Sequence, residues 1–92
     1  MPAKTLLFVA KDMELARVRC HVWQAGGYNA RAVDLATATS WAGDAPDVLV
    51  ISYHFDPQGP ESKALAGKFP NSRTVHLPRG VVGRELMKAV SA

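Results

Sequence analysis

Pro46-Asp47-Val48-Leu49-Val50-Ile51-Ser52 is the stretch of this chain that decides its fold. The apolar run at 48–51, rich in β-branched residues, predicts a short strand that is buried on both faces. Pro46 and Asp47 mark its beginning, and the turn-forming segment 55–60 marks its end. Strands buried on both faces are typical of a parallel sheet with helices on either side. The rest of the chain should therefore supply further strands and the helices that cover them.

Strand-like and helix-like segments alternate along the whole chain. Strands are predicted at 5–10, 28–33, 48–51 and 73–78, and helices at 13–25, 34–43, 61–68 and 82–90. This alternation, without a long linker, predicts an α/β fold in which a parallel sheet carries helices on both faces. We expect the strand at 28–33 to lie at an edge. The whole chain, residues 1–92, should form a single domain.

The helix predicted at 13–25 has the clearest pattern. Asp12 can cap its first turn, and Gly26-Gly27 can end it. Its apolar residues recur at three- and four-residue spacing, which predicts one buried face that includes Trp23. The residues expected on that face are Met13, Leu15, Ala16, Val18, Cys20, Val22 and Trp23.

Composition and charge limit the function classes that fit the chain. With 92 residues, 48% hydrophobic and 21% charged, it has a normal globular composition. The net charge of +3 is too small to favour nucleic-acid binding. The whole excess of positive charge lies after residue 72, and it belongs either to a solvated helix face or to a basic docking surface. No apolar run approaches the ~20 residues of a membrane span, and the start is a poor signal peptide. The single Cys20 cannot form an internal disulfide, which favours a reducing, cytoplasmic setting.

Ser52, His54 and Asp56 have the residue types of a nucleophilic triad. In an extended strand, side chains two residues apart share a face but lie ~6–7 Å from each other, so the three should not converge. No Gly-x-Ser-x-Gly turn exposes the serine. His21 and His76 lie in other elements, without the paired spacing of a zinc site. The sequence therefore predicts neither an enzyme nor a metal or other cofactor.

The order of elements and several short motifs resemble the receiver domain of bacterial two-component response regulators. The run 46–52 is similar to the family's strand that ends in the phosphoaccepting aspartate, and 24–30 is similar to its first helix end and second strand. The segment 77–80 is similar to its Leu-Pro-Lys-Pro motif, and 85–90 to its last helix. The resemblance covers nearly the whole chain. It implies a flavodoxin/receiver-like, three-layer α/β/α sandwich with a shortened parallel sheet of about four strands.

Two substitutions relative to that family should abolish its chemistry. Receivers bind Mg²⁺ through an acidic pair after the first strand, and the equivalent places here are Ala10 and Lys11, with only the following Asp12 acidic. Ser52 stands in place of the phosphoaccepting aspartate, and a hydroxyl cannot replace acyl-phosphate chemistry. Arg79 matches the lysine that follows the family's fifth strand. The resemblance implies that these five residues line a degenerate phosphorylation pocket.

A third departure is length, because a typical receiver has five strand–helix units and this chain has room for four. The match of Arg79 favours loss of the fourth unit, although the last strand could correspond to the family's fourth or fifth. The family's switching Ser or Thr then has no counterpart, and Thr74 is the nearest candidate. Loss of a unit should leave a sheet edge and an apolar patch that need a partner.

The resemblance thus predicts a non-phosphorylatable pseudo-receiver that acts in signalling through protein–protein contact, with a partner protein or as a homodimer. The expected recognition surface consists of Tyr53, His54, Phe55, Arg84 and Lys88. The alternative is a small-molecule or anion sensor that uses the crevice at the C-terminal ends of the strands, near Lys11, Ser52 and Arg79. Neither a nucleic acid nor a membrane is expected as a partner.

Overall fold

The computed structural model describes residues 4–81 and 83–91, in which strands and helices alternate as predicted. The elements are β1 (Thr5–Val9), α1 (Met13–Ala25), β2 (Asn29–Val33), α2 (Leu35–Thr39), β3 (Val48–Ile51), α3 (Pro60–Lys68), β4 (Arg73–His76) and α4 (Arg84–Ser91). The predicted start of the last helix, Val82, lies outside the described residues. No described helix has both the length and the apolar character needed to span a membrane.

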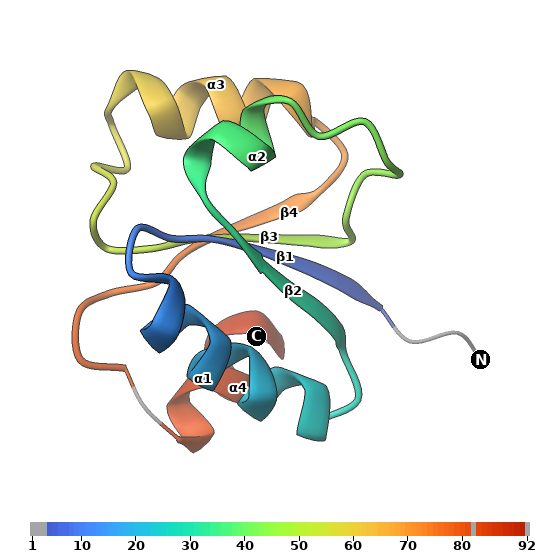
Figure 1. Ribbon diagram of the computed structural model, residues 1–92, viewed down its shortest axis with the longest axis vertical. Helices are drawn as coiled ribbons and strands as arrows, with labels where there is room; N and C mark the ends of the chain where they lie inside the picture. Colours follow the sequence, from blue (N-terminus) through green and yellow to red (C-terminus); the bar gives the residue numbers. More distant parts are fainter. Residues whose placement is uncertain (1–3, 82, 92) are drawn as a thin grey trace.

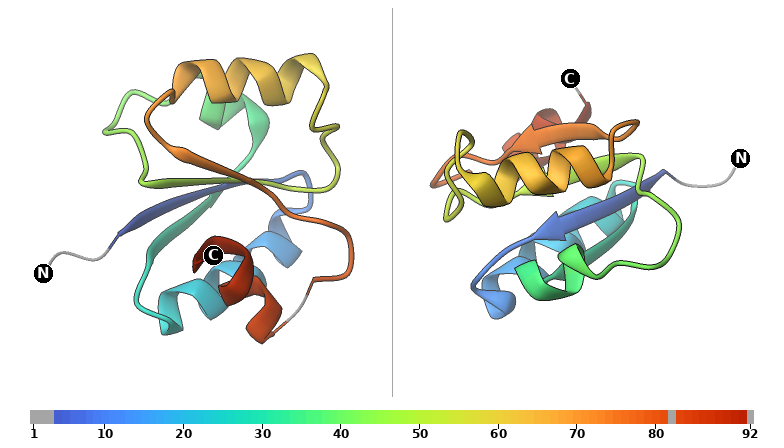
Figure 2. Two further views of the ribbon diagram at one scale, coloured as in Figure 1. Left: turned by 180° about the vertical axis from the view of Figure 1, so that it is seen from behind. Right: turned by 90° about the horizontal axis from the view of Figure 1, so that it is seen from above.

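The four strands form one parallel sheet in the order β2-β1-β3-β4. Figure 1 shows three layers, with α1 and α4 on one face of the sheet and α2 and α3 on the other. The views in Figure 2 show the same arrangement from behind and from above. Every residue of β3 is buried, as the apolar run predicted, because helices cover both faces of the central strands. The α/β prediction is confirmed at this level, and β2 lies at an edge as expected.

Trp23 lies in the core between the sheet and the helices α1 and α4. Its side chain is 0% exposed, and its ring meets that of Phe8 edge-to-face with the centroids 5.2 Å apart. The indole N–H donates to the carbonyl of Leu86 on α4, at 2.9 Å. The prediction for Trp23 is therefore confirmed. The predictions for Leu15 and Val18 are wrong, because these side chains are 39% and 60% exposed.

The buried face of α1 is narrower than the apolar pattern suggested. The helix buries only a stripe of its surface against the sheet and α4. That stripe consists of Ala16, Arg19, Cys20 and Trp23. Arg19 belongs to it although it is charged, which is consistent with a long aliphatic stem packed on apolar neighbours.

The helix α2 is shorter than the predicted span 34–43. Asp34 caps it by accepting the backbone N–H of Thr37 at 2.8 Å, and hydrogen bonds from the Thr37 side chain and backbone lower the pKa of this carboxyl. The hydroxyl of Thr39 donates to a carbonyl one turn earlier, a local bond that competes with continued helix. The chain leaves the helix there and forms a loop over residues 40–47.

The last strand and helix close the structure without a gap in the sheet. β4 pairs directly with β3, and α4 returns to the face that α1 covers. The guanidinium of Arg73, at the start of β4, donates to the carbonyl of Val90 near the end of α4, at 3.1 Å. Within the described residues no strand pairs with the outer side of β4, so the sheet has two open edges.

Candidate functional site

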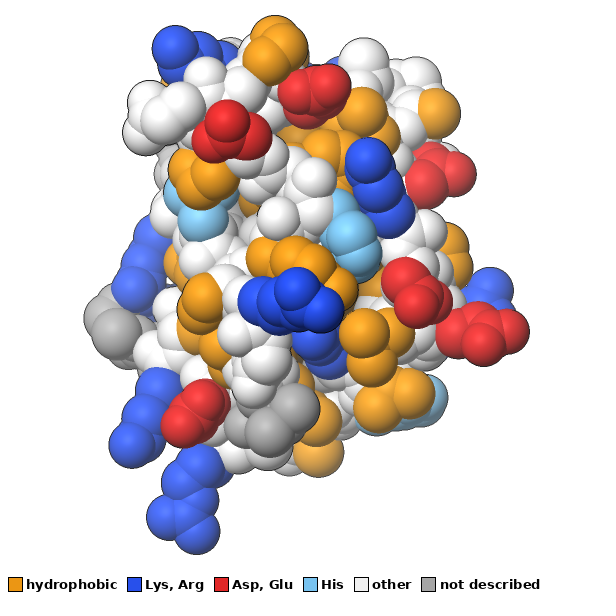
Figure 3. Space-filling view, turned by 90° about the vertical axis from the view of Figure 1, so that its left-hand side faces the viewer, with side chains coloured by type: hydrophobic (Ala, Val, Ile, Leu, Met, Phe, Trp, Pro, Cys, Tyr) orange, Lys and Arg blue, Asp and Glu red, His pale blue; other side chains and the backbone are white. Residues whose placement is uncertain are grey.

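The carboxyl ends of the four parallel strands lie together at one end of the sheet, and Figure 3 shows this end from outside. The backbone N–H of Ser52 donates to Val9 at 2.9 Å, and that of Leu77 donates to Ile51 at 2.8 Å. These bonds extend the ladder one residue beyond β3 and β4. Open α/β sheets bind their ligands in the crevice outside the carboxyl ends of the strands. Near the centre of this face, basic side chains lie among hydrophobic ones, with histidine beside them (Figure 3).

The residues after β1 offer little that could bind a cation. Ala10 is buried, and Lys11 is exposed. Asp12 is engaged as the cap of α1, since its carboxylate accepts the backbone N–H of Leu15 at 3.2 Å. Across residues 4–81 and 83–91, no three His, Cys, Asp or Glu side chains gather as metal ligands.

Ser52 and His54 do converge, contrary to the expectation from an extended strand. β3 ends at Ile51, and a turn follows in which the N–H of Phe55 donates to the carbonyl of Ser52 at 3.0 Å. The turn brings the hydroxyl of Ser52 and Nδ1 of His54 to 2.8 Å. Asp56 is not seen to join them, because its carboxylate accepts the N–H of Gln58 further along the loop, at 2.9 Å.

This Ser–His pair lacks two features of a hydrolase site. Ser52 is only 1% exposed, so its hydroxyl has little room for an incoming carbonyl group. The third member of a triad would orient the imidazole, and Asp56 is engaged elsewhere. The bond instead satisfies a buried hydroxyl, which would otherwise be costly to desolvate.

Each of the two predicted pocket cations lies over an aromatic ring of the loop after β3. Nζ of Lys11 is 5.5 Å from the ring centroid of Phe55, and the guanidinium carbon of Arg79 is 5.9 Å from that of Tyr53. Tyr53 and His54 are themselves stacked, with centroids 4.2 Å apart and planes inclined by 27°. Cation–π attraction thus holds both cations beside the carboxyl end of β3 without an intervening acid.

Four of the five residues of the predicted recognition surface are exposed, and one is buried. Tyr53 is 37% exposed and His54 is also exposed, whereas Phe55 is buried in the core between the sheet and α3. Arg84 and Lys88 are exposed on α4. No described contact links these two side chains to the aromatic residues after β3. The exposed part of the site therefore consists of Tyr53 and His54, with Lys11 and Arg79 beside them.

A small pocket next to this surface was not predicted. It has a volume of ≈ 230 Å³ and lies between the turn after β3 and the end of β4. Its lining consists of Ser52, Tyr53, Phe55, Pro57, His76, Leu77 and Pro78. The pairing of Ile51 with His76 places His76 there. Sequence reasoning could have found it only by assuming that the last strand pairs with β3.

The buried Ser62 was also missed. Its hydroxyl, in the first turn of α3, has no hydrogen-bond partner among the described residues.

Comparison of this chain with protein-family models, with curated proteins and with solved structures finds no match.

Proposed function

We propose that the protein is a receiver-like interaction module that is not phosphorylated. The strand order β2-β1-β3-β4, with helices on both faces, supports a shortened fold of the flavodoxin type. The groups at the carboxyl edge support loss of phosphorylation, because Ala10, Lys11 and Ser52 supply a methyl, an ammonium and a hydroxyl where the resemblance requires carboxylates.

The observation that carries the interaction role is the ordered arrangement around Tyr53. The ring is partly exposed, yet it is stacked on His54 and has Arg79 over it. Tyr and Arg are enriched among the residues that dominate binding energy at protein interfaces. Side chains already fixed by their neighbours lose little conformational entropy when a partner binds. This surface is therefore preorganised for a protein partner or for a second copy of the chain.

A pair of surface variants tests this role. Quantitative affinity capture from native lysate should recover a partner with the wild-type protein and lose it with Tyr53→Ala combined with Arg79→Ala. The control is Val18→Ala, which changes an exposed apolar residue on α1. Sedimentation of the purified wild-type protein and of the same variants tests whether the chain forms a homodimer through this surface. A partner retained equally by both variants, together with a monomer at all concentrations, would contradict the proposal.

Anion sensing is a second candidate, favoured by the charges of Lys11 and Arg79. Among the described residues neither cation forms an ion pair with a carboxylate, and both lie beside the turn that follows Ser52. An inorganic anion bound between them would replace the missing acidic groups. Isothermal titration with sulfate or phosphate tests it, and Lys11→Ala should abolish the heat of binding.

A further inference from the structure

The outer edge of β2 presents backbone groups that no strand uses. In a parallel ladder, the N–H and C=O of one residue point to the same neighbouring strand, and successive residues alternate. The N–H of Asn29 donates to Lys4 at 2.8 Å, and the carbonyl of Val33 accepts from Ala10 at 3.0 Å. Asn29, Arg31 and Val33 therefore face β1. Ala30 and Ala32 direct their backbone groups outward.

One side chain covers part of this edge. The amide of Gln24, near the end of α1, donates to the carbonyl of Ala30 at 3.0 Å. The N–H of Ala30 and both backbone groups of Ala32 have no partner among the described residues. β2 has no proline, and the one charged side chain that it carries, Arg31, lies over the ring of Trp41 on the loop side of the sheet. The edge is thus open to another strand.

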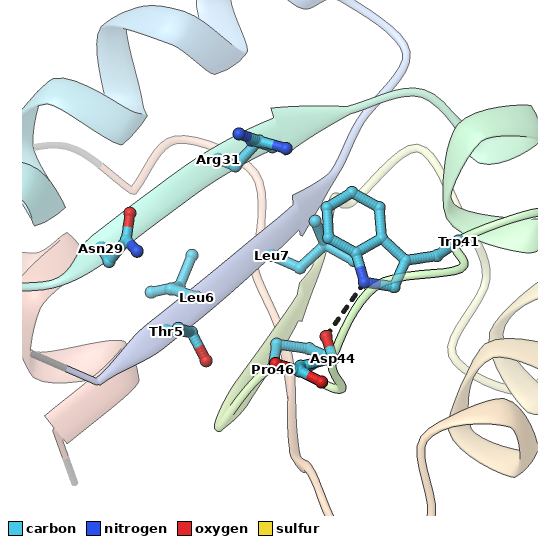
Figure 4. A pocket seen from close by; sticks show the side chains of 8 residues that line it. All are labelled: Thr5, Leu6, Leu7, Asn29, Arg31, Trp41, Asp44 and Pro46. Atoms are coloured by element: carbon cyan, nitrogen blue, oxygen red, sulfur yellow. Dashed lines mark hydrogen bonds between the residues drawn. The ribbon is translucent and has the colours of Figure 1, made fainter.

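A hollow lies on each side of this edge. On the α1 side, a groove of ≈ 430 Å³ runs between the helix and the strand and is lined by Arg17, Cys20, His21, Gln24, Asn29, Ala30, Arg31 and Ala32. On the other face of the sheet, the smaller pocket of Figure 4, of ≈ 230 Å³, lies over β1 and β2 and is lined by Thr5, Leu6 and Leu7 of β1 as well as by Asn29 and Arg31. In Figure 4, Trp41, Asp44 and Pro46 of the loop face Asn29 and Arg31 of β2 across the β1 strand.

The smaller pocket is shaped by contacts within the loop and with β2. The indole N–H of Trp41 donates to the carbonyl of Asp44 at 3.0 Å, which fixes the ring over the sheet. The guanidinium carbon of Arg31 lies 5.7 Å from that ring. The volume is below the ~300–1,000 Å³ of pockets for drug-sized ligands. It therefore suits a single side chain rather than a whole small molecule.

The charge around the edge is predominantly positive. Arg17 and His21 line the groove on the α1 side, and Arg31 lines both hollows. None of the three forms an ion pair within the part of the chain that the structure describes. Asp44, on the loop side, is the acid among the residues that line these two hollows, and Asp34, which directly follows β2, caps α2. An extended segment along β2 would be attracted if it carried acidic side chains toward α1.

A second copy of the chain fits this edge poorly. In the antiparallel register that pairs the whole of Asn29–Val33, a twofold axis would place Arg31, the middle residue, opposite its own copy. Like charges directly opposite each other destabilise a strand pair. The charge pattern therefore selects a different chain, one of opposite charge.

We propose that β2 receives an acidic, extended segment of a partner protein as a fifth strand. Backbone bonds to Ala30 and Ala32 supply affinity, and side chains on alternate faces supply specificity. On the α1 side, glutamates or aspartates face Arg17 and His21. On the loop side, one apolar or aromatic side chain enters the pocket beside Trp41. This surface is separate from the one around Tyr53, and the proposal does not depend on that one.

Titration with a designed peptide tests the proposal. The probe is a blocked heptapeptide that alternates glutamate with valine and phenylalanine (EVEFEVE), and its charge control is KVKFKVK. In amide hydrogen exchange followed by NMR, the N–H of Ala32 should exchange quickly in the free protein and become protected with the acidic peptide. The N–H of Arg31, already bonded to β1, should be protected throughout. An Ala32 amide that stays unprotected, or equal binding of the basic peptide, would overturn the proposal.

Variants separate strand pairing from general electrostatics. Arg17→Glu and Arg31→Glu should each weaken peptide binding about tenfold, whereas Lys63→Glu, the same charge change on α3, should change it little. Gln24→Ala frees the carbonyl of Ala30 and should strengthen binding about two- to tenfold. Equal effects of the three charge reversals, or weaker binding by Gln24→Ala, would refute strand addition.

Two further measurements address the other possible occupant and surface. If a second copy covers the edge, the free protein should protect the Ala32 amide increasingly with concentration, and this result would also overturn the proposal. Tyr53→Ala should leave peptide affinity unchanged. Loss of peptide binding in that variant would assign the peptide to the other surface and refute the β2 site.

Discussion

Replacing Trp23 by alanine tests how α1 and α4 are held on the sheet. The ring is 0% exposed, contacts Phe8 edge-to-face and donates to the carbonyl of Leu86. Truncation of a large buried aromatic costs ~3–5 kcal/mol. That total includes an aromatic pair of ~0.5–1.5 kcal/mol and a buried carbonyl left unpaired. At ~0.05–0.15 kcal/mol per residue, a chain of this length has about 5–14 kcal/mol of stability, so the variant should keep about 0–11 kcal/mol and be marginally folded if the wild type lies near the lower end.

A second substitution divides this cost into its parts. Trp23→Phe keeps an aromatic ring near Phe8 but removes the indole N–H, and Leu86 then loses its donor. We expect a loss of about 1–3 kcal/mol, the cost of an unsatisfied buried polar group. The matched control is Val18→Ala on the same helix, which should stay within about 0.5 kcal/mol of the wild type because the side chain is exposed.

Urea unfolding followed by far-UV circular dichroism measures these differences, since that signal does not depend on the replaced indole. Fluorescence of Trp41 gives an independent probe in the alanine and phenylalanine variants. A loss below about 1 kcal/mol for Trp23→Ala, or one equal to that of Val18→Ala, would show that α1 does not pack as described.

Four other predictions concern the site and single buried groups. Incubation with acetyl phosphate and Mg²⁺ should leave the intact mass unchanged, and a stable addition of one phosphoryl group at Ser52 would contradict the proposed loss of phosphorylation. Sulfate or phosphate should raise the Tm by mass action, and this increase should disappear in Lys11→Ala and in Arg79→Ala. A Tm that neither anion changes would reject the anion site. Ser62→Ala should leave the free energy of unfolding in urea unchanged or raise it by about 0.5–1 kcal/mol, because the hydroxyl is buried and has no partner among the described residues. A loss above about 1 kcal/mol would show that this hydroxyl forms a hydrogen bond. Burial raises the pKa of Cys20 to about 11 from 9.0, so iodoacetamide at pH 8 should label this thiol only after unfolding. Because the thiol ionises at lower pH in the unfolded chain, the free energy of unfolding should fall from about pH 9 to 11. Fast labelling of the native protein would contradict the burial of Cys20.

The sequence predicted the elements whose pattern reports burial directly. The run Val48–Ile51 is apolar without alternation because both of its faces are covered, and Trp23 is buried because it lies at helical spacing from Ala16 and Cys20. The same pattern misplaced Val18. Periodicity indicates which side chains are apolar, whereas the width of the sheet beneath the helix decides how many of them are covered.

The site was less predictable because its geometry depends on a turn and on strand order. An extended continuation of β3 would separate Ser52 from His54, and a single turn bond brings them to 2.8 Å. His76 lines the adjacent pocket only because β4 pairs with β3. The resemblance to receivers did indicate Lys11 and Arg79. The sequence did not predict that these two cations lie over aromatic rings, because that arrangement depends on the path of the loop after β3.

The loop after β3 occupies the groups at the carboxyl end of the sheet, on which the proposed interaction role rests. Three consecutive residues of the loop each engage a group that would otherwise be available at the edge: Tyr53 lies under Arg79, His54 bonds Ser52, and Phe55 lies under Lys11. Phe55 is also anchored in the core, which holds the loop against the sheet. An exposed side chain that its neighbours already hold can still contact a partner, whereas the hydroxyl of Ser52, which His54 contacts, is buried and has little access to a substrate. These three contacts are the basis on which we propose Tyr53 and Arg79 as a recognition surface.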